Sequence, residues 1–122
     1  MKQIEIKAAI ENLIDTFLYA GKVSIELRKK GLIKEIKEDN TPVSNGDLEV
    51  NRILTEKINN LTPQIPIVSE ETSHNKSKKD LKNFWLIDPI DGTYDYINDL
   101  DEFTLNAGLI INNRAVAGII YA

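Results

Sequence analysis

Two aspartates three residues apart are the most chemically suggestive feature of this sequence. Asp88 and Asp91 follow the apolar run 84–87, and a proline stands between them. A short apolar run is typical of a buried strand, so both carboxylates would leave its end near one point. The residues Asp-Pro-Ile-Asp-Gly are equally typical of a turn, because Asp, Pro and Gly are favoured turn residues. The motif alone leaves a cation site and a plain turn both open.

Two further acids favour the cation site. Glu70 follows a second apolar run, 65–68, and Asp47 stands three residues after Ser44 at the start of an amphipathic stretch. Each acid therefore lies at one end of a predicted element, where a rigid backbone can aim it. Carboxylates that converge cannot all stay ionised unless cations neutralise them. Oxygen ligands without cysteine, and with no histidine in a ligand-like setting, favour Mg²⁺ or Mn²⁺ over Zn²⁺.

Two long helices are predicted, and the second of them would position Asp47. Apolar residues recur at helical spacing over 3–30, and Gly31 after two lysines ends the pattern. Gly21 inside this helix marks a weak point, or a place where another group packs closely. The second helix is predicted over 45–61, with Ser44 as its N-cap in a capping box. The helix dipole then favours the ionised form of an acid in its first turn.

Short strands are predicted for most of the remaining chain, with turns and loops between them. Pro42 requires an extended conformation before it, so 38–47 is predicted as a loop. The segment 72–83 is polar and basic, so we expect a mobile loop with His74 in solvent. Glu71 and Asp95 are interpreted as surface carboxylates. The predicted strands are an edge strand at 32–37, buried strands at 65–68 and 84–87, and a hairpin of 103–111 and 115–121 joined by Asn112–Asn113.

Composition limits the protein class. The chain has 122 residues, of which 42% are hydrophobic, so it forms one domain or part of one. Its net charge is -4 and it has no large basic cluster, which argues against a nucleic acid polymer as partner. It has no cysteine, and no apolar stretch approaches the roughly 20 residues of a spanning helix. Without a signal-peptide pattern, a cytoplasmic protein is expected, and a peripheral association with the inner membrane stays open.

Three ordered segments resemble the inositol monophosphatase superfamily, which consists of lithium-sensitive, magnesium-dependent phosphomonoesterases. Residues 85–93 (Trp-Leu-Ile-Asp-Pro-Ile-Asp-Gly-Thr) resemble its metal motif, 69–71 its upstream acidic pair, and 37–47 its first loop. Residues 61–71 and 102–106 are most similar to the 3'(2'),5'-bisphosphate nucleotidase (CysQ-type) branch. One local departure is Tyr94-Asp95, where that branch tends to have a basic residue and then an acid.

The resemblance implies an α+β fold, a layered α/β sandwich of the inositol monophosphatase/fructose-bisphosphatase type. Residues 1–122 would form its N-terminal portion, with two long helices packed on a largely antiparallel sheet. The family's second half has no counterpart here, and with it the aspartate that completes a second metal site. We therefore expect an incomplete second site, and an open edge or apolar face that promotes association.

The resemblance also implies a set of metal ligands. Glu70, Asp88 and the backbone carbonyl of Ile90 would bind a first Mg²⁺. Asp88 and Asp91 would share a second ion, and Asp39 would contribute to a third and weaker one.

The implied catalytic pair is Asp47 and Thr93, which would orient and deprotonate the attacking water. A threonine hydroxyl becomes a useful relay only where an acid accepts its hydrogen bond. The amides of Gly92 and Thr93 would hold the substrate phosphate.

The function implied by the resemblance is removal of the 3'-phosphate from adenosine 3',5'-bisphosphate, or from its phosphosulfate, by metal-activated water. An inositol or sugar phosphate monophosphatase is the first alternative. The second is a truncated or split fragment that is inactive alone and binds only a metal or a partner. A second polypeptide that supplies the missing half, and a homo-oligomer, are the protein partners considered.

Overall fold

The two long helices form where the sequence predicts them. The computed structural model describes residues 2–71 and 81–122, so the prediction for His74 lies outside the described residues. Helix α1 spans Gln3–Lys30 and ends at Gly31, whose φ of 93° suits glycine. Helix α2 spans Asn45–Leu61 and begins at Ser44 in the predicted capping box.

The main sheet has four strands in the order β3-β4-β5-β6. Strand β3 pairs with β4 in parallel, and the other two pairs are antiparallel. Asn112 and Asn113 form the turn of the last hairpin with φ of 50° and 64°, as predicted from the tolerance of Asn for positive φ. The strands are β3 (Ile67–Ser69), β4 (Phe84–Asp91), β5 (Thr104–Ile111) and β6 (Arg114–Tyr121).

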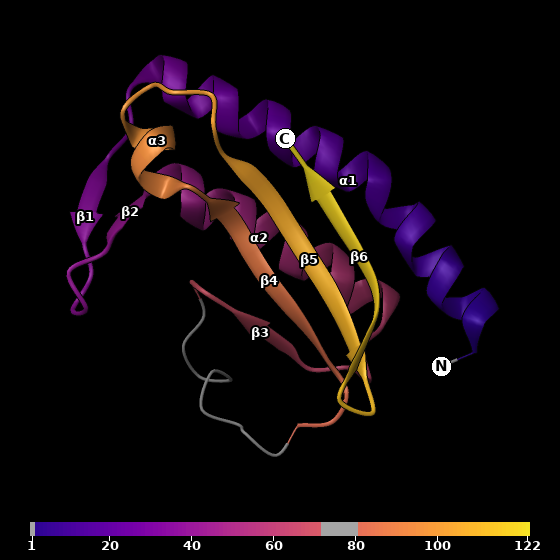
Figure 1. The fold of residues 1–122 in the computed structure, drawn as a ribbon. Coiled ribbons are helices and arrows are strands. Elements are labelled where there is room, and N and C mark those ends of the chain that lie inside the picture. Colours follow the sequence, from indigo (N-terminus) through magenta and orange to yellow (C-terminus); the bar gives the residue numbers. More distant parts are fainter. Residues whose placement is uncertain (1, 72–80) are drawn as a thin grey trace.

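Both helices lie on one face of this sheet, and the core fills the space between (Figure 1). Alternate residues of β4 and β5 point into it, so Trp85 and Leu109 are fully buried against Leu13 and Phe17 of α1 and their neighbours. The indole Nε1 of Trp85 donates to Thr62 Oγ1 at 2.9 Å, which fastens β4 to the end of α2. The predicted arrangement of two helices on a largely antiparallel sheet is confirmed.

The opposite face of the sheet carries a shallow hollow of about 520 Å³. Leu86 pairs across the strands with Gly108, which in turn pairs with Gly118, so two positions in this row have no side chain. Leu86 and Ile120 line the hollow and are 50% and 74% exposed. Asp88 lies at the edge of the same hollow.

Three local predictions differ from the structure. The predicted loop 38–47 contains a strand, β2 (Pro42–Ser44), which pairs with β1 (Lys34–Ile36) in a small antiparallel hairpin. Proline is acceptable there because it is the first residue of an edge strand. Strand β4 continues through the expected turn to Asp91, with an irregular register after Asp88. A short helix, α3 (Thr93–Ile97), was not predicted, because five residues are too few to show a helical period.

Candidate functional site

A hydrogen bond joins the first turn of α2 to the first residue of α3. Asp47 is fully buried, and its Oδ1 accepts from Thr93 Oγ1 at 2.8 Å. Its Oδ2 accepts from the backbone N–H of Ser44 at 2.9 Å and from Ser44 Oγ at 2.5 Å. One carboxylate oxygen thus fixes the helix cap, and the other holds the threonine. The structure brings the predicted catalytic pair together.

Thr93 is placed by the residue before it. Gly92 has φ 90° and ψ 40°, a left-handed conformation, and a Cβ there would lie 2.8 Å from the carbonyl oxygen of Glu102. Thr93 Oγ1 also lies 3.1 Å from the carbonyl oxygen of Ile90. A hydroxyl has one proton and two lone pairs, so while it donates to Asp47 its oxygen can still accept from a water.

Asp88 is the centre of the negative charge. It is half-buried, and its pKa is raised to about 6 by burial first and then by the charges of Asp91, Glu70, Glu71 and Asp47. These four carboxylates come from α2, the end of β3 and the end of β4. The acids that the sequence singled out therefore act electrostatically on one residue. A hard cation would relieve that repulsion.

The acids do not yet form a ligand shell. Within residues 2–71 and 81–122, no three acidic or histidine side chains are grouped closely enough to hold one metal ion. This is compatible with the raised pKa of Asp88, since charges act over several ångströms whereas Mg²⁺ needs oxygens at about 2.1 Å. Oxygen donors fit Mg²⁺ in kind, and Glu70 and Asp91 are exposed, so an ion can reach them from solvent.

Asp39 stands apart from this group. It lies in the turn of the β1–β2 hairpin, where its Oδ1 accepts from the hydroxyl and the amide of Thr41 at 2.5 and 3.1 Å. These hydrogen bonds lower the pKa of Asp39, and Asp39 is not among the charges that shift Asp88. The prediction that Glu71 is a surface carboxylate is wrong. Its side chain is 8% exposed and pairs with Lys37 at 3.7 Å.

The sequence did not predict the residues that pack behind Asp47 and Thr93, the predicted catalytic pair. Tyr96 of α3 is fully buried and donates its hydroxyl to the carbonyl oxygen of Ser24 in α1 at 2.7 Å. Its ring lies against Gly46, the neighbour of Asp47. A glycine in a first helical turn and a tyrosine 50 residues later give no signal in one sequence, because their relation depends on tertiary packing.

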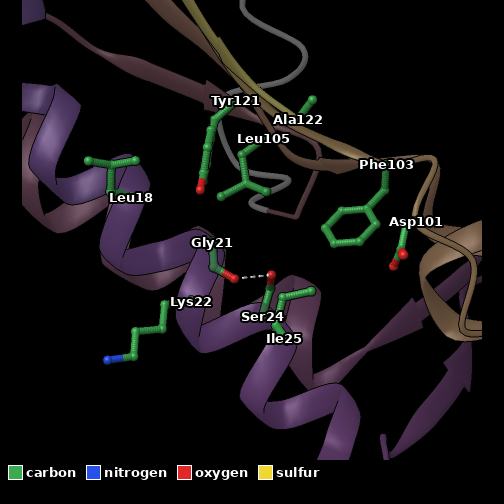
Figure 2. A pocket seen from close by; sticks show the side chains of 10 residues that line it. All are labelled: Leu18, Gly21, Lys22, Ser24, Ile25, Asp101, Phe103, Leu105, Tyr121 and Ala122. Atoms are coloured by element: carbon green, nitrogen blue, oxygen red, sulfur yellow. Dashed lines mark hydrogen bonds between the residues drawn. The ribbon is translucent and has the colours of Figure 1, made fainter.

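A separate cavity of about 400 Å³ lies between α1 and the C-terminal part of β6 (Figure 2). Apolar side chains such as Leu105 and Phe103 line it, and none of the acids proposed as ligands does. The ring of Tyr121 covers Gly21 there, which confirms that a group packs closely on this helical glycine. This cavity is therefore a packing feature that contains none of the predicted site residues.

Comparison with known proteins then identifies the family. The sequence pattern of the inositol monophosphatase family matches residues 6–122. The chain belongs to this family. A protein of Haemophilus influenzae named 3'(2'),5'-bisphosphate nucleotidase CysQ is 42% identical over 105 residues, which are 84% of this chain and 39% of that protein. The chain spans about two fifths of the length of the curated relatives it matches.

Solved structures of inositol monophosphatases have the same fold as this chain. The IMPase of Thermotoga maritima superposes with a TM-score of 0.81 at 23% identity, covering 93% of this chain and 43% of that one. An IMPase/NADP phosphatase complexed with Mg²⁺ and phosphate gives a TM-score of 0.75 at 19% identity, covering 92% and 43%. The predicted fold class is confirmed. Among the described residues, no helix is long and apolar enough to cross a membrane.

Proposed function

We propose that this chain supplies the water-orienting pair and most metal ligands of a Mg²⁺-dependent phosphomonoesterase. The observation that carries the proposal is the 2.8 Å hydrogen bond from Thr93 to Asp47 beside the acids around Asp88. The proposed substrate is adenosine 3',5'-bisphosphate or its phosphosulfate, and the nucleotidase name of the 42% identical relative supports that choice.

Asp47 and Thr93 do the proton chemistry in this proposal. Thr93 Oγ1 accepts a hydrogen bond from the attacking water while it donates to Asp47 Oδ1. As the water oxygen bonds to phosphorus, its proton passes to Thr93, and the threonine proton passes to Asp47. The P–O bond to the sugar breaks on the opposite side, its electron pair leaves with the sugar oxygen, and that oxygen takes a proton from solvent to become the alcohol, while Asp47 later returns its proton to solvent. Burial keeps the accepting carboxylate of Asp47 away from bulk water.

The remaining proposed site residues would bind metal ions. Glu70, Asp88 and the Ile90 carbonyl would bind one Mg²⁺, or Mn²⁺, and Asp88 and Asp91 would supply part of a second site. When bound, these ions offset the repulsion around Asp88 and stabilise negative charge on the phosphate oxygens.

The backbone is proposed to complete the phosphate contacts. The amides of Gly92 and Thr93 would hold the substrate phosphate where β4 gives way to α3. A third ion near Asp39 stays a prediction, since that carboxylate is already engaged by Thr41.

Phosphate release tests this proposal. The chain is assayed alone, and also co-expressed with the part of the Haemophilus relative that it does not cover. The substrates are adenosine 3',5'-bisphosphate and inositol 1-phosphate, with Mg²⁺ and with or without Li⁺. Asp47→Asn and Thr93→Val should each lower the rate by about 10²-fold or more, as expected for loss of general-base catalysis. Asp15→Asn, at an exposed position on α1, is the control.

Each other result decides between the alternatives. Turnover of the inositol ester alone would replace the nucleotidase proposal with an inositol phosphatase. No turnover in either form would reject the enzyme and leave a metal- or partner-binding module. A Thr93→Val variant as active as the wild type would remove the proposed relay.

A further inference from the structure

Position 46 has no room for a side chain. A Cβ placed on Gly46 would lie 2.1 Å from Tyr96 Oη and 2.7 Å from both Cε2 and Cζ of the same ring. Non-bonded carbon atoms attract at about 3.5–4.0 Å and repel strongly at such short distances. The tyrosine hydroxyl therefore occupies the volume that any other residue at position 46 would need.

Tyr96 cannot easily move away. Its hydroxyl donates to the Ser24 carbonyl at 2.7 Å, and its ring meets Phe103 edge-on with centroids 4.9 Å apart. The Arg28 guanidinium lies 5.7 Å from its ring centroid and is itself fixed by Asp101 at 2.6 Å. The ring is buried on all sides by these contacts, so its position is set by α1 and by the segment after α3.

The two partners of this contact are neighbours of the catalytic pair. Gly46 precedes Asp47 in α2, and Tyr96 is three residues after Thr93, on the same side of α3. We propose that Tyr96 is a positioning residue, which with Gly46 sets the separation of α2 and α3 so that Thr93 reaches Asp47. The catalytic meaning of this inference rests on the proposed function, whereas its geometry does not.

A double-mutant series measures this coupling through stability. Thr93→Val removes the hydroxyl that donates to Asp47. The resulting drop in the urea midpoint reports whether that hydrogen bond is present. The drop is compared in the wild type, Gly46→Ala, Tyr96→Phe and the Gly46→Ala/Tyr96→Phe double variant. We expect it to shrink to less than about half in Gly46→Ala, because the added methyl separates the two helices.

Rescue makes the test specific. Phenylalanine lacks the hydroxyl that lies nearest to the added methyl, and without its bond to Ser24 the ring can shift. The Thr93→Val effect should therefore return to about its wild-type size in the double variant. If Gly46→Ala alone does not fold, the double variant is compared with Tyr96→Phe. A double variant that also fails to fold overturns the proposal.

The chain offers a matched control in Gly21. Its Cβ would lie 2.4 Å from Cε2 of Tyr121, so Gly21→Ala also forces a methyl against a tyrosine, but in the cavity of Figure 2, whose lining includes none of Gly46, Asp47 and Thr93. The Thr93→Val effect should be unchanged in Gly21→Ala. Two results would show that Gly46 and Tyr96 form a packing contact only. One is a Thr93→Val effect in Gly46→Ala as large as in the wild type. The other is a reduction of that effect in Gly21→Ala equal to the reduction in Gly46→Ala.

Activity gives the second readout. For an active form of the enzyme, kcat should fall in Gly46→Ala with little change in KM, and should recover in the double variant. If the wild type releases no phosphate from any ester, the proposed function fails, while the urea series still decides the positioning role.

Discussion

Asp88 is predicted to bind a metal ion, and its ionised form lowers the stability of the metal-free chain. Its pKa is about 6 in the folded chain against an ordinary value of 3.8. Between these values the folded state binds more protons than the unfolded state, so stability falls as pH rises from about 4 to about 6 and stays lower above that. Solvent limits the size of this loss, because Asp88 is only half-buried. The loss of stability is therefore greatest above about pH 6, where the carboxylate is ionised and able to bind a metal ion.

Asp88→Asn should therefore stabilise the metal-free chain at pH 7.5 but not at pH 4. At pH 7.5 it removes a charge that burial and Asp91 disfavour, whereas at pH 4 the folded-state carboxyl is already neutral. Urea midpoints in a chelating buffer measure both values, with the exposed Asp15→Asn as control. A gain of equal size at both pH values would mean that charge is not the cause.

At the scale of elements, the junction of α2 with β4 depends on one buried pair. Thr62 is 2% exposed, and its Oγ1 donates to the Ile58 carbonyl at 3.0 Å and accepts from the Trp85 indole at 2.9 Å. Trp85 is fully buried, so its indole N–H cannot bond to bulk water instead. The pair therefore holds the strand that carries Asp88 against the end of the helix that begins near Asp47.

Thr62→Val should destabilise the chain by about 1–3 kcal/mol, because the indole N–H is left buried without an acceptor. Thr55→Val is the control: that hydroxyl bonds only to backbone carbonyls of its own helix, so its loss should cost less than about 1 kcal/mol. Urea unfolding followed by the fluorescence of the single tryptophan measures both. Equal costs would show that the contact between Thr62 and Trp85 contributes nothing.

Elements with a repeating pattern were predictable, and those without one were not. The helical spacing of Leu13 and Phe17 located α1, and the alternation through Leu105 and Leu109 located β5. Strand β1 lies within the predicted edge strand 32–37, whereas its partner β2 was missed because Pro42 suggested a loop, although an edge strand can begin with proline.

The candidate site divides in the same way. The approach of Asp47 to Thr93 followed from ordered motifs with a known relation, and the structure contains it. The contact between Gly46 and Tyr96 could not be predicted, because it joins a residue that lacks a side chain to one whose neighbours come from α1, α2 and the segment before β5.

At the scale of the whole molecule, residues 2–71 and 81–122 leave one face of the sheet covered and the other open. The helices cover the first, and the second presents Leu86 and Ile120 around the hollow formed by two glycines. Apolar side chains grouped in this way are typical of surfaces that another protein covers. The expectation that the chain associates remains a prediction of the sequence, and this face is where we expect association to occur.

Ile120→Ser should weaken self-association of the chain and reduce binding of an apolar dye, because it removes the most exposed apolar side chain of the hollow. Ile4→Ser is the matched control: Ile4 is 75% exposed on α1, against 74% for Ile120, but does not line the hollow. Sedimentation over a range of concentrations measures the change. A wild-type chain that stays monomeric throughout would rule out this use of the face.

The parallel pairing of β3 with β4 has a consequence for the time course of folding. A two-residue turn joins β5 to β6, whereas β3 can join β4 only after the whole segment between Ser69 and Phe84 has closed. Contacts that require longer closures form later, so we expect β3 to dock after the hairpin. Glu70 and Glu71 would then approach Asp88 only after the hairpin has formed, so that part of the negative charge around Asp88 would be added at this late step. A φ-value at Val68 as high as that at Leu109 would contradict this order.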